Sequence, residues 1–196
     1  MGLDMYLRAR NKKTEKLIPK KYLEYRELKD DKQFIEEQGK DKVFDLIMSN
    51  CLFPVQCTYS NYVYLSTNLE LGYWRKANAI HKWFVDNVQD GVDDCDEYVV
   101  SKEQLSQLRD LCKEVIESLE NSPTHMVQDR NGVYSIEEFI NISKAKRLLP
   151  TTDGFFFGDS HYTKYYLEDL RETVRICDKV MYQVNDDWDI TYHSSW

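Results

Sequence analysis

The sequence predicts an α+β fold, a single domain over residues 1–196 that is mostly helical with a small antiparallel sheet. Three observations lead to this prediction. The chain's 196 residues fit one domain. Several segments space their apolar residues as amphipathic helices do. Leu3, Met5 and Leu7 alternate with polar residues near the N-terminus, as in a strand with one buried face.

Four segments carry the helical spacing of apolar residues: 41–51, 74–87, 101–120 and 160–182. The third has the clearest start, because Ser101 and Gln104 match a capping box. Its expected buried stripe is Leu105, Leu108, Cys112, Val115 and Leu119. The expected inward stripe of the fourth is Tyr166, Leu170, Val174, Cys177 and Met181.

The remaining segments predict shorter elements. Residues 59–72 are rich in Tyr, Val, Thr and Leu and predict one or two strands. Asn131-Gly132 predicts a hairpin turn, and Ser135 with Glu138 predicts the cap of a helix that ends before Pro150. Residues 11–42 are charged and predict short helical pieces, and the tail 185–196 is expected to fray.

The net charge is −8, with 34 acidic against 26 basic side chains. A negative molecule repels a phosphate backbone, so we expect no general nucleic-acid binding. No run of 18 apolar residues occurs, which predicts no membrane span. The acidic cluster over residues 86–97 predicts a solvated loop; a bound cation or a basic partner surface remains open.

The metal-ligating residue types show no ligand spacing. The five cysteines include no CxxC pair, so we expect buried free thiols. His81 lies on the apolar stripe of its predicted helix, which is typical of a core histidine. We therefore expect no metal ion and no cofactor.

The first candidate ligand site lies at Tyr73, Trp74, Arg75 and Lys76. Two cations at the start of the predicted helix 74–87 oppose the helix dipole, which suggests a bound anion. Arg75 and Lys76 would bind phosphates, and Tyr73 and Trp74 would stack on a base. Pairing of the two cations with nearby acidic loops is the structural alternative.

The second candidate segment is the run of three phenylalanines between Gly154 and Gly158. In an extended chain Phe155 and Phe157 share one face, so two rings fill the core and one lines a pocket or an interface. We assign Phe156 and Tyr162 to stacking and Ser160 and Lys164 to supporting polar contacts; a purely structural role is the alternative.

No established nucleophile, metalloprotease or phosphate-loop motif occurs, so we expect a binding protein rather than an enzyme. A phosphodiesterase-like enzyme remains open, with His81, His161 and the acidic cluster as candidates. The many tyrosines and tryptophans make a homo-oligomer an expectation as well.

Three stretches, Met1–Leu7, Tyr73–Asn87 and Leu148–Leu170, resemble a protein family of bacteriophages and prophages. The intervening Gly91–Cys95 adds to the likeness. The resemblance implies a phage-encoded protein of the bacterial host cytoplasm that counters host defence by binding. We expect it to sequester a small anionic, nucleotide-like immune signal. The alternative is an acidic inhibitor of a host defence enzyme or nuclease. The sequence leaves the ligand, the defence system and the oligomeric state open.

Overall fold

The computed structural model describes residues 2–12, 68–128 and 132–196. The chain divides into two compact units. Unit 1 comprises Met1–Arg8, Glu70–Tyr182 and Ile190–Trp196, and unit 2 comprises Ala9–Leu69 and Gln183–Asp189. The predicted helix 41–51, the predicted strands before residue 68 and the charged segment beyond residue 12 lie outside the described residues.

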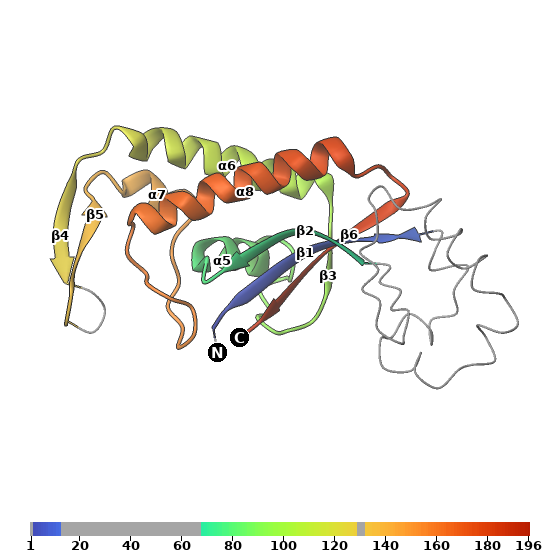
Figure 1. Cartoon of the computed structure of the whole chain (residues 1–196), viewed down its shortest axis with the longest axis horizontal. Coiled ribbons are helices and arrows are strands. Elements are labelled where there is room, and N and C mark those ends of the chain that lie inside the picture. The colour runs from blue at the N-terminus through green and yellow to red at the C-terminus, as the bar shows by residue number, and fades with distance from the viewer. Residues whose placement is uncertain (1, 13–67, 129–131) are drawn as a thin grey trace, which may run out of the picture. The chain divides into compact units, whose positions relative to one another are not determined.

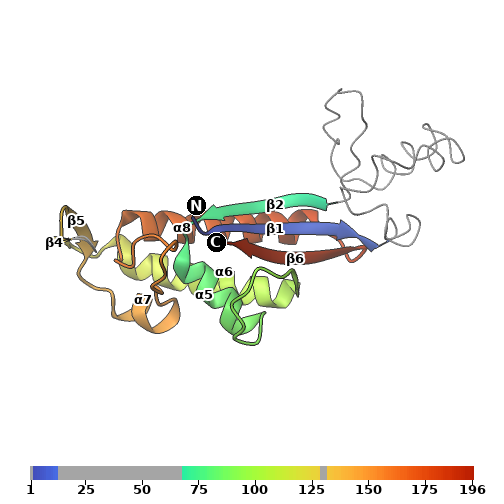
Figure 2. The same cartoon turned by 90° about the horizontal axis from the view of Figure 1, so that it is seen from below.

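The described strands form two sheets, and Figures 1 and 2 show β2, β1 and β6 side by side. The larger sheet has the order β2-β1-β6-β3. Its strands are β1 (Asp4–Asn11), β2 (Asn68–Arg75), β3 (Tyr98–Val100) and β6 (Trp188–Ser195). The smaller sheet is the antiparallel hairpin of β4 (Thr124–Gln128) and β5 (Ser135–Phe139).

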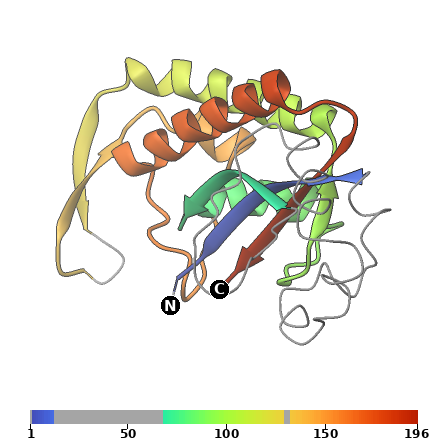
Figure 3. The same cartoon turned by 45° about the vertical axis from the view of Figure 1, so that its right-hand side comes forward.

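Four helices complete the described residues: α5 (Asn78–Asn87), α6 (Lys102–Glu120), α7 (Ser143–Leu148) and α8 (Lys164–Gln183). Figure 3 shows α6 and α8 running alongside each other. Arg109 of α6 pairs with Asp178 of α8 at 3.4 Å, and Arg171 of α8 pairs with Glu120 of α6 at 3.0 Å. The two pairs link opposite ends of the helices, so α6 and α8 are antiparallel. The predicted α+β fold with a small antiparallel sheet is confirmed.

One face of the larger sheet carries the core. Leu3, Met5 and Leu7 are fully buried, as their alternation predicts. The indole of Trp74 on β2 donates a buried hydrogen bond of 2.9 Å to the Thr173 hydroxyl on α8. The same indole lies 6.0 Å from the ring of Phe84 on α5, measured between centroids. Helices α5 and α8 therefore cover the same face of the sheet.

The prediction for α6 is confirmed in detail. Ser101 accepts a hydrogen bond from the backbone N–H of Gln104, and the Gln104 side chain accepts one from the backbone N–H of Ser101. The helix buries one continuous stripe along its length. These residues are Leu105, Leu108, Cys112, Val115 and Leu119.

The predicted helix 74–87 begins four residues too early. Trp74 and Arg75 end β2, and the helix begins at Asn78. The backbone N–H of Lys76 donates to the Leu3 carbonyl at 2.8 Å, which continues the contact with the start of β1. Pairing with β1 outweighs the helical spacing of these side chains. Arg75 and Lys76 therefore precede the helix rather than open it.

Helix α8 also begins later than predicted, at Lys164 instead of residue 160. The hydroxyl of Thr163 accepts a hydrogen bond from the backbone N–H of Tyr165 at 3.3 Å, as an N-cap residue does. Of the predicted inward stripe, Tyr166, Leu170 and Cys177 are buried, whereas Val174 and Met181 are only half-buried.

Two further expectations are wrong. Residues 188–195 do not fray but form β6, an interior strand of the sheet, because Ile190 and Tyr192 belong to the core. Ser135 and Glu138 do not cap a helix but lie in β5, which pairs with β4 through Val127 and Ile136. The later helix, α7, does end before Pro150, as expected.

The three phenylalanines form a turn rather than an extended run. None of them is fully buried, and the ring of Phe155 is 91 % exposed. The expectation of two phenylalanines in the core is therefore wrong. No helix among the described residues is long and apolar enough to cross a membrane.

Asn78, the first residue of α5, fixes the loop of residues 151–161 through three hydrogen bonds. Its side-chain nitrogen donates to the carbonyl oxygens of Phe157 at 3.1 Å and Asp159 at 2.8 Å. Its side-chain oxygen accepts from the backbone N–H of Thr152 at 3.2 Å. Asn78 is only 4 % exposed, so these bonds are shielded from water. The loop is thereby tied to the start of α5.

We expect Asn78→Ala to lower the free energy of unfolding by about 2–4 kcal/mol, because it leaves buried loop groups without partners. Urea denaturation measures this loss. Asn87→Ala is the matched control, since Asn87 lies at the other end of α5 and makes one exposed-side contact with the Trp83 carbonyl. Equal losses for the two variants would contradict a special role of Asn78.

Candidate functional site

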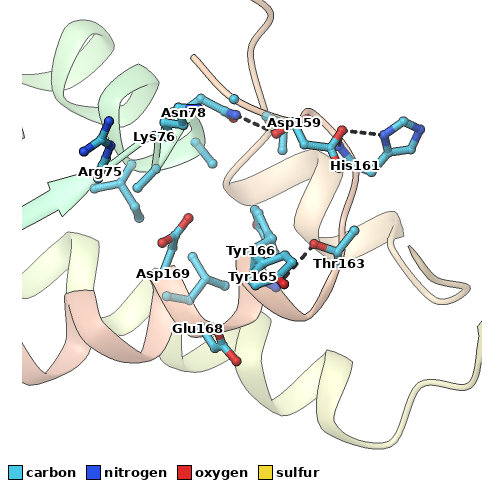
Figure 4. A pocket seen from close by; sticks show the side chains of 16 residues that line it. Arg75, Lys76, Asn78, Asp159, His161, Thr163, Tyr165, Tyr166, Glu168 and Asp169 are labelled. Atoms are coloured by element: carbon cyan, nitrogen blue, oxygen red, sulfur yellow. Dashed lines mark hydrogen bonds and ion pairs between the residues drawn. The ribbon is translucent and has the colours of Figure 1, made fainter. Parts of the chain in front are cut away.

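A pocket of about 340 Å³ lies within unit 1, where the end of β2, the start of α5, the 151–161 loop and the start of α8 meet. Figure 4 shows its wall. The polar residues that line it are Arg75, Lys76, Asn78, Thr151, Asp159, His161, Thr163, Tyr165, Tyr166, Glu168 and Asp169. Its volume is at the lower end of the range typical of small-molecule sites.

The junction between β2 and α5 holds Lys76 in an unusual backbone conformation. Lys76 has a φ of 61°, in the left-handed region that side chains with a Cβ rarely adopt. Two hydrogen bonds fix it: its N–H donates to Leu3, and its carbonyl accepts from the N–H of Asn78 at 2.9 Å. Gly158 packs against it so closely that an added Cβ would lie 3.0 Å from the Lys76 Cβ. The junction is thus a tight, specified turn.

The two cations at this junction have no acidic partner among the described residues. Arg75 and Lys76 are both exposed, both line the pocket, and neither forms an ion pair with a described carboxylate. Other cations of unit 1 do pair: Lys82 lies 2.8 Å from Asp86 and Arg109 lies 2.9 Å from Asp110. Within this part of the chain, the alternative that Arg75 and Lys76 are neutralised by acidic loops finds no support.

Asp169 of α8 brings a carboxyl group to the same pocket. Figure 4 shows this carboxyl pointing from α8 toward the β2–α5 junction. No described residue donates a hydrogen bond to it. Burial raises the pKa of Asp169 to about 7, and the neighbouring charge of Glu168 adds to the rise. An unpartnered carboxyl that titrates near neutrality is typical of functional sites.

The pocket has one exposed aromatic side chain among its lining residues, Tyr165, which is 66 % exposed. The ammonium of Lys164 lies 5.2 Å from the centroid of this ring. The neighbouring Tyr166 is buried, and its hydroxyl donates to the Leu149 carbonyl at 2.8 Å. Tyr165 is therefore the ring that a ligand in this pocket can reach.

Of the eight residues predicted from the sequence, the structure places Arg75 and Lys76 in the pocket wall. Trp74 and Tyr162 are 3 % and 5 % exposed, so their rings are not available for stacking on a ligand. Tyr73 lies outside the pocket wall, where its hydroxyl bonds to Asp4 and its ring packs 5.3 Å from that of Tyr6.

The other three predicted residues also lie outside the pocket wall. Phe156 contributes its carbonyl, which accepts a 3.0 Å hydrogen bond from the N–H of Leu3. Ser160 contributes its carbonyl to the Thr151 hydroxyl at 2.8 Å. Lys164 contacts the pocket only through the ring of Tyr165. The carbonyl contacts of Phe156 and Ser160 help to hold the loop in place, whereas Lys164 lies beside the exposed ring of Tyr165 at the start of α8.

The prediction missed Asn78, Tyr165 and Asp169. A signal for Asp169 was present, since it follows Tyr166 by three residues and precedes Thr173 by four on the buried side of α8. A carboxyl on the apolar side of an amphipathic helix is unfavourable unless it has a function. Asn78 carried no comparable signal, because its partners are backbone groups of a distant loop.

His81 is a core residue, as its position predicts. It is 1 % exposed, and both ring nitrogens have partners: Nδ1 lies 2.8 Å from the Tyr192 hydroxyl and Nε2 lies 3.1 Å from Asp93. A carboxylate only accepts, so Nε2–H donates to Asp93 and Nδ1 accepts from Tyr192. Burial lowers the pKa of His81, against the opposing charge of Asp93. The ring links α5 to β6.

The acidic segment 86–97 is built into the fold through several of its carboxylates. Asp93 also accepts a hydrogen bond from the indole of Trp196 at 3.2 Å. Asp94 accepts from the Tyr98 hydroxyl at 3.0 Å, and Glu97 accepts from the Thr191 hydroxyl at 2.7 Å. No group of three or more metal-ligating side chains gathers anywhere in the described residues.

The cysteine prediction is correct for two of the three described residues. Cys112 and Cys177 are buried free thiols, and burial raises the pKa of both, that of Cys177 to about 12. Cys95 is exposed, contrary to expectation. Cys51 and Cys57 lie outside the described residues.

No protein-family model, curated protein or solved structure matches this chain. The resemblance to a phage and prophage family therefore stays a prediction, and the site is argued from its geometry alone.

We expect Gly158→Ala to destabilise the protein by about 1–3 kcal/mol, because Gly158 has a φ of +87° and its added methyl would press on Lys76. Gly91→Ala is the matched control: its φ is +80°, but its added methyl would meet open space. Thermal unfolding of both variants measures the cost of the close approach to Lys76. Equal destabilisation of the two variants would show that contact with Lys76 adds nothing to the free-energy cost of placing a Cβ at a positive φ.

We expect Asp169→Asn to stabilise the protein at pH 8 by on the order of 2–4 kcal/mol, and by progressively less as the pH falls toward 4. The raised pKa means that the folded state binds the proton more tightly, so the stability contributed by Asp169 is complete below about pH 4 and is lost as the pH rises through 7. Chemical denaturation across this range measures the difference.

Glu117→Gln is the control for the pH series, since Glu117 is an exposed carboxylate on α6 that does not line the pocket. Its difference from the native chain should vary little with pH. An Asp169→Asn variant that is destabilised equally at every pH would contradict the unpartnered, buried state of this carboxyl.

Proposed function

We propose that the chain is a binding protein that holds a small anionic, nucleotide-like ligand in the pocket at the β2–α5 junction. The observation that carries this proposal is that one pocket is lined by two cations without an acidic partner among the described residues, Arg75 and Lys76, and by a carboxyl without a donor among them, Asp169. Without a ligand, the described protein leaves the two cations only water to bind and gives the carboxyl no donor. One ligand with an anionic group and hydrogen-bond donors would pair with all three.

The cations fit a phosphate. The guanidinium of Arg75 offers a planar donor fork to phosphate oxygens, and the ammonium of Lys76 adds a compact positive charge. The net charge of the chain is −8, so these two exposed cations are a local exception on an acidic molecule. A small phosphorylated compound can approach such a site, whereas a long phosphate backbone meets repulsion from the rest of the surface.

The size of the pocket favours a mononucleotide over a polymer. Its volume of about 340 Å³ suits a ligand of one base, one sugar and one or two phosphates. Tyr165 supplies an exposed ring at the rim on which a flat base can stack. Together with the resemblance to phage proteins, this supports sequestration of a nucleotide-like signal of host defence in the bacterial cytoplasm.

A hydrolytic enzyme is the second candidate, and one contact favours it. His161 Nδ1 lies 2.7 Å from Asp159 Oδ1 at the pocket, an arrangement that can orient a general base. Figure 4 shows the His161 ring pointing away from Asp169, so the two groups do not face a common reacting atom. Recovery of intact nucleotide after incubation, measured by mass spectrometry, would exclude turnover.

An acidic inhibitor of a host enzyme gains less support from the geometry. Asp93, Asp94 and Glu97 of the acidic segment are used in contacts that hold α5, β3 and β6 together. Neutralising these side chains would weaken the fold as well as any basic partner's docking, so pull-down experiments with such variants need a folding control.

Calorimetric titration with nucleoside diphosphates, cyclic nucleotides, ADP-ribose and inorganic pyrophosphate tests the proposal. We expect at least one nucleotide to bind and Arg75→Gln and Lys76→Gln each to weaken it about tenfold or more, the value of a lost charged hydrogen bond. Lys82→Gln is the control, because Lys82 on α5 pairs with Asp86 and does not line the pocket.

The variant Lys76→Gly separates the effect of the Lys76 charge on binding from the effect of its left-handed backbone on stability. It removes the ammonium but relieves the left-handed conformation, so it should lose affinity while gaining stability. Absence of binding across the whole panel, or equal binding by the native chain and the Arg75→Gln, Lys76→Gln double variant, would overturn the proposal.

A further inference from the structure

We propose that Asp169 selects the ligand by accepting two hydrogen bonds from its base, and that the base is guanine. This inference rests on the proposed function and names the ligand class of the same pocket. It makes Asp169 a specificity-determining residue, whereas Arg75 and Lys76 bind whichever phosphorylated compound enters.

The geometry places the two kinds of group on facing walls. Arg75 and Lys76 come from the end of β2, and Asp169 comes from the second turn of α8. Figure 4 shows the Asp169 carboxyl directed across the pocket toward the junction that carries the cations. A ligand that holds its phosphates at the junction therefore presents its other end to α8.

The protein itself supplies no donor for this carboxyl among the described residues. The two neighbouring hydroxyls are already committed. Tyr166 donates to the Leu149 carbonyl, and Thr173 donates to the backbone carbonyl of Asp169 at 2.7 Å. The donors that satisfy the carboxyl must then come from water or from the ligand.

The charges around Asp169 favour a neutral donor over a second acid. Glu168 on the same helix and Asp159 on the loop are acidic, and both line the pocket. The basic side chains that line it, Arg75 and Lys76, come from the junction, with His161 on the loop as a further titratable group. An anionic group of a ligand is thus drawn to the junction and repelled from α8.

The chemistry of the bases then singles out guanine. An ionised carboxylate is a pure acceptor with two oxygens, so it pairs best with two adjacent donors. Guanine presents two adjacent donors, N1–H and the N2 amino group, on one edge. Adenine and cytosine place their single amino donor beside an acceptor nitrogen, and uracil flanks its one N–H with carbonyl oxygens. Each of these bases would set an acceptor against the carboxylate.

The carboxyl's raised pKa supports the same arrangement. Burial holds the proton on Asp169 up to about pH 7, so a base with two donors binds the ionised form and competes with that proton. Guanine binding should therefore strengthen as the pH rises from 6 to 8.

The competing explanation is that Asp169 serves only as a counter-charge for Lys76, reached by rotation of the two side chains. The two explanations differ in what Asp169→Asn does. Removal of a counter-charge would tighten binding of every anion alike. If the Asp169 carboxylate instead recognises the base, Asp169→Asn changes which base binds, because the asparagine side chain offers one acceptor and one donor in place of two acceptors. Xanthine matches that pair, with N1–H as its donor and the C2 carbonyl as its acceptor.

The experiment is calorimetric titration of the native chain, Asp169→Asn and the control Glu117→Gln with the diphosphates of guanosine, inosine, adenosine and xanthosine, and with inorganic pyrophosphate; Glu117 is exposed on α6 and does not line the pocket. For the native chain and Glu117→Gln we expect the guanosine compound to bind about tenfold or more tightly than the inosine and adenosine compounds. For Asp169→Asn we expect the preference to move to the xanthosine compound, with pyrophosphate affinity unchanged.

A thermal melt of each variant verifies folding, and Asp169→Glu provides a second variant that keeps the carboxyl and should keep the preference for guanosine at reduced affinity. Equal binding of all four diphosphates would not contradict the proposed function, but it would overturn the proposal that Asp169 recognises guanine. Tighter binding of pyrophosphate and every diphosphate by Asp169→Asn would likewise overturn it in favour of the counter-charge. Binding of none of these compounds would overturn the assignment of guanine, and the proposed function falls with it only if the cyclic nucleotides and ADP-ribose do not bind either.

Discussion

The pocket depends on the side chain of Asn78. Its amide spans the gap between the start of α5 and the 151–161 loop with two donated bonds and one accepted bond, all nearly shielded from water. The loop has no regular structure of its own between Thr151 and His161, so its position comes from such contacts. An apolar or acidic residue at position 78 would leave the carbonyls of Phe157 and Asp159 without this donor. Because the loop and the β2–α5 junction both line the site, this amide holds two of its walls together.

Around that fixed frame, several locally unfavourable features occur together. Lys76 has a left-handed backbone, Arg75 and Lys76 are cations without a described acidic partner, and Asp169 is a half-buried carboxyl without a described donor. Helix α6 obeys the local rules, with its complete capping box at Ser101 and its unbroken buried stripe. Single departures also occur away from the pocket, in the left-handed Asp90 and in the buried side-chain oxygen of Gln89 without a described partner, but there no unpaired cations join them among the described residues. Proteins depart from such rules mainly where function compensates the cost. The combination of these unfavourable features at Arg75, Lys76 and Asp169 identifies this pocket as a candidate site more specifically than its volume does.

The sequence predicted those elements whose signals are local. The alternation of β1, the capping box and stripe of α6, and the core position of His81 each depend on spacing within one segment. The errors arose where a distant strand decided the outcome. Trp74 and Arg75 were assigned to a helix by their spacing, but pairing with the start of β1 keeps them extended. The tail after residue 185 carries a strand-like alternation of Trp188, Ile190 and Tyr192 with polar residues, which the prediction overlooked, and it completes the sheet between β1 and β3. Arg75 and Lys76 were chosen as two cations at the start of a predicted helix, whereas they precede α5, so the stated reason for choosing them was wrong although both line the pocket. Asn78 acts through backbone groups of a loop 74 to 81 positions away.

The contrast between the His81–Asp93 pair and the carboxyl of Asp169 shows why polar contacts alone do not identify the site. Both ring nitrogens of His81 have hydrogen-bond partners, Tyr192 and Asp93. Because burial also lowers the pKa of His81, the ring is a neutral link between α5 and β6. A group whose hydrogen bonds are all made inside the protein has nothing left to offer a ligand. Asp169 is the opposite case, a carboxyl placed on the wall of a pocket with its acceptors unused by the described residues. The same reasoning separates Lys82, held by Asp86, from Lys76 six residues earlier. Unused bonding capacity directed into a shared space, rather than burial or charge, is therefore the property that distinguishes the proposed binding residues from their structural neighbours.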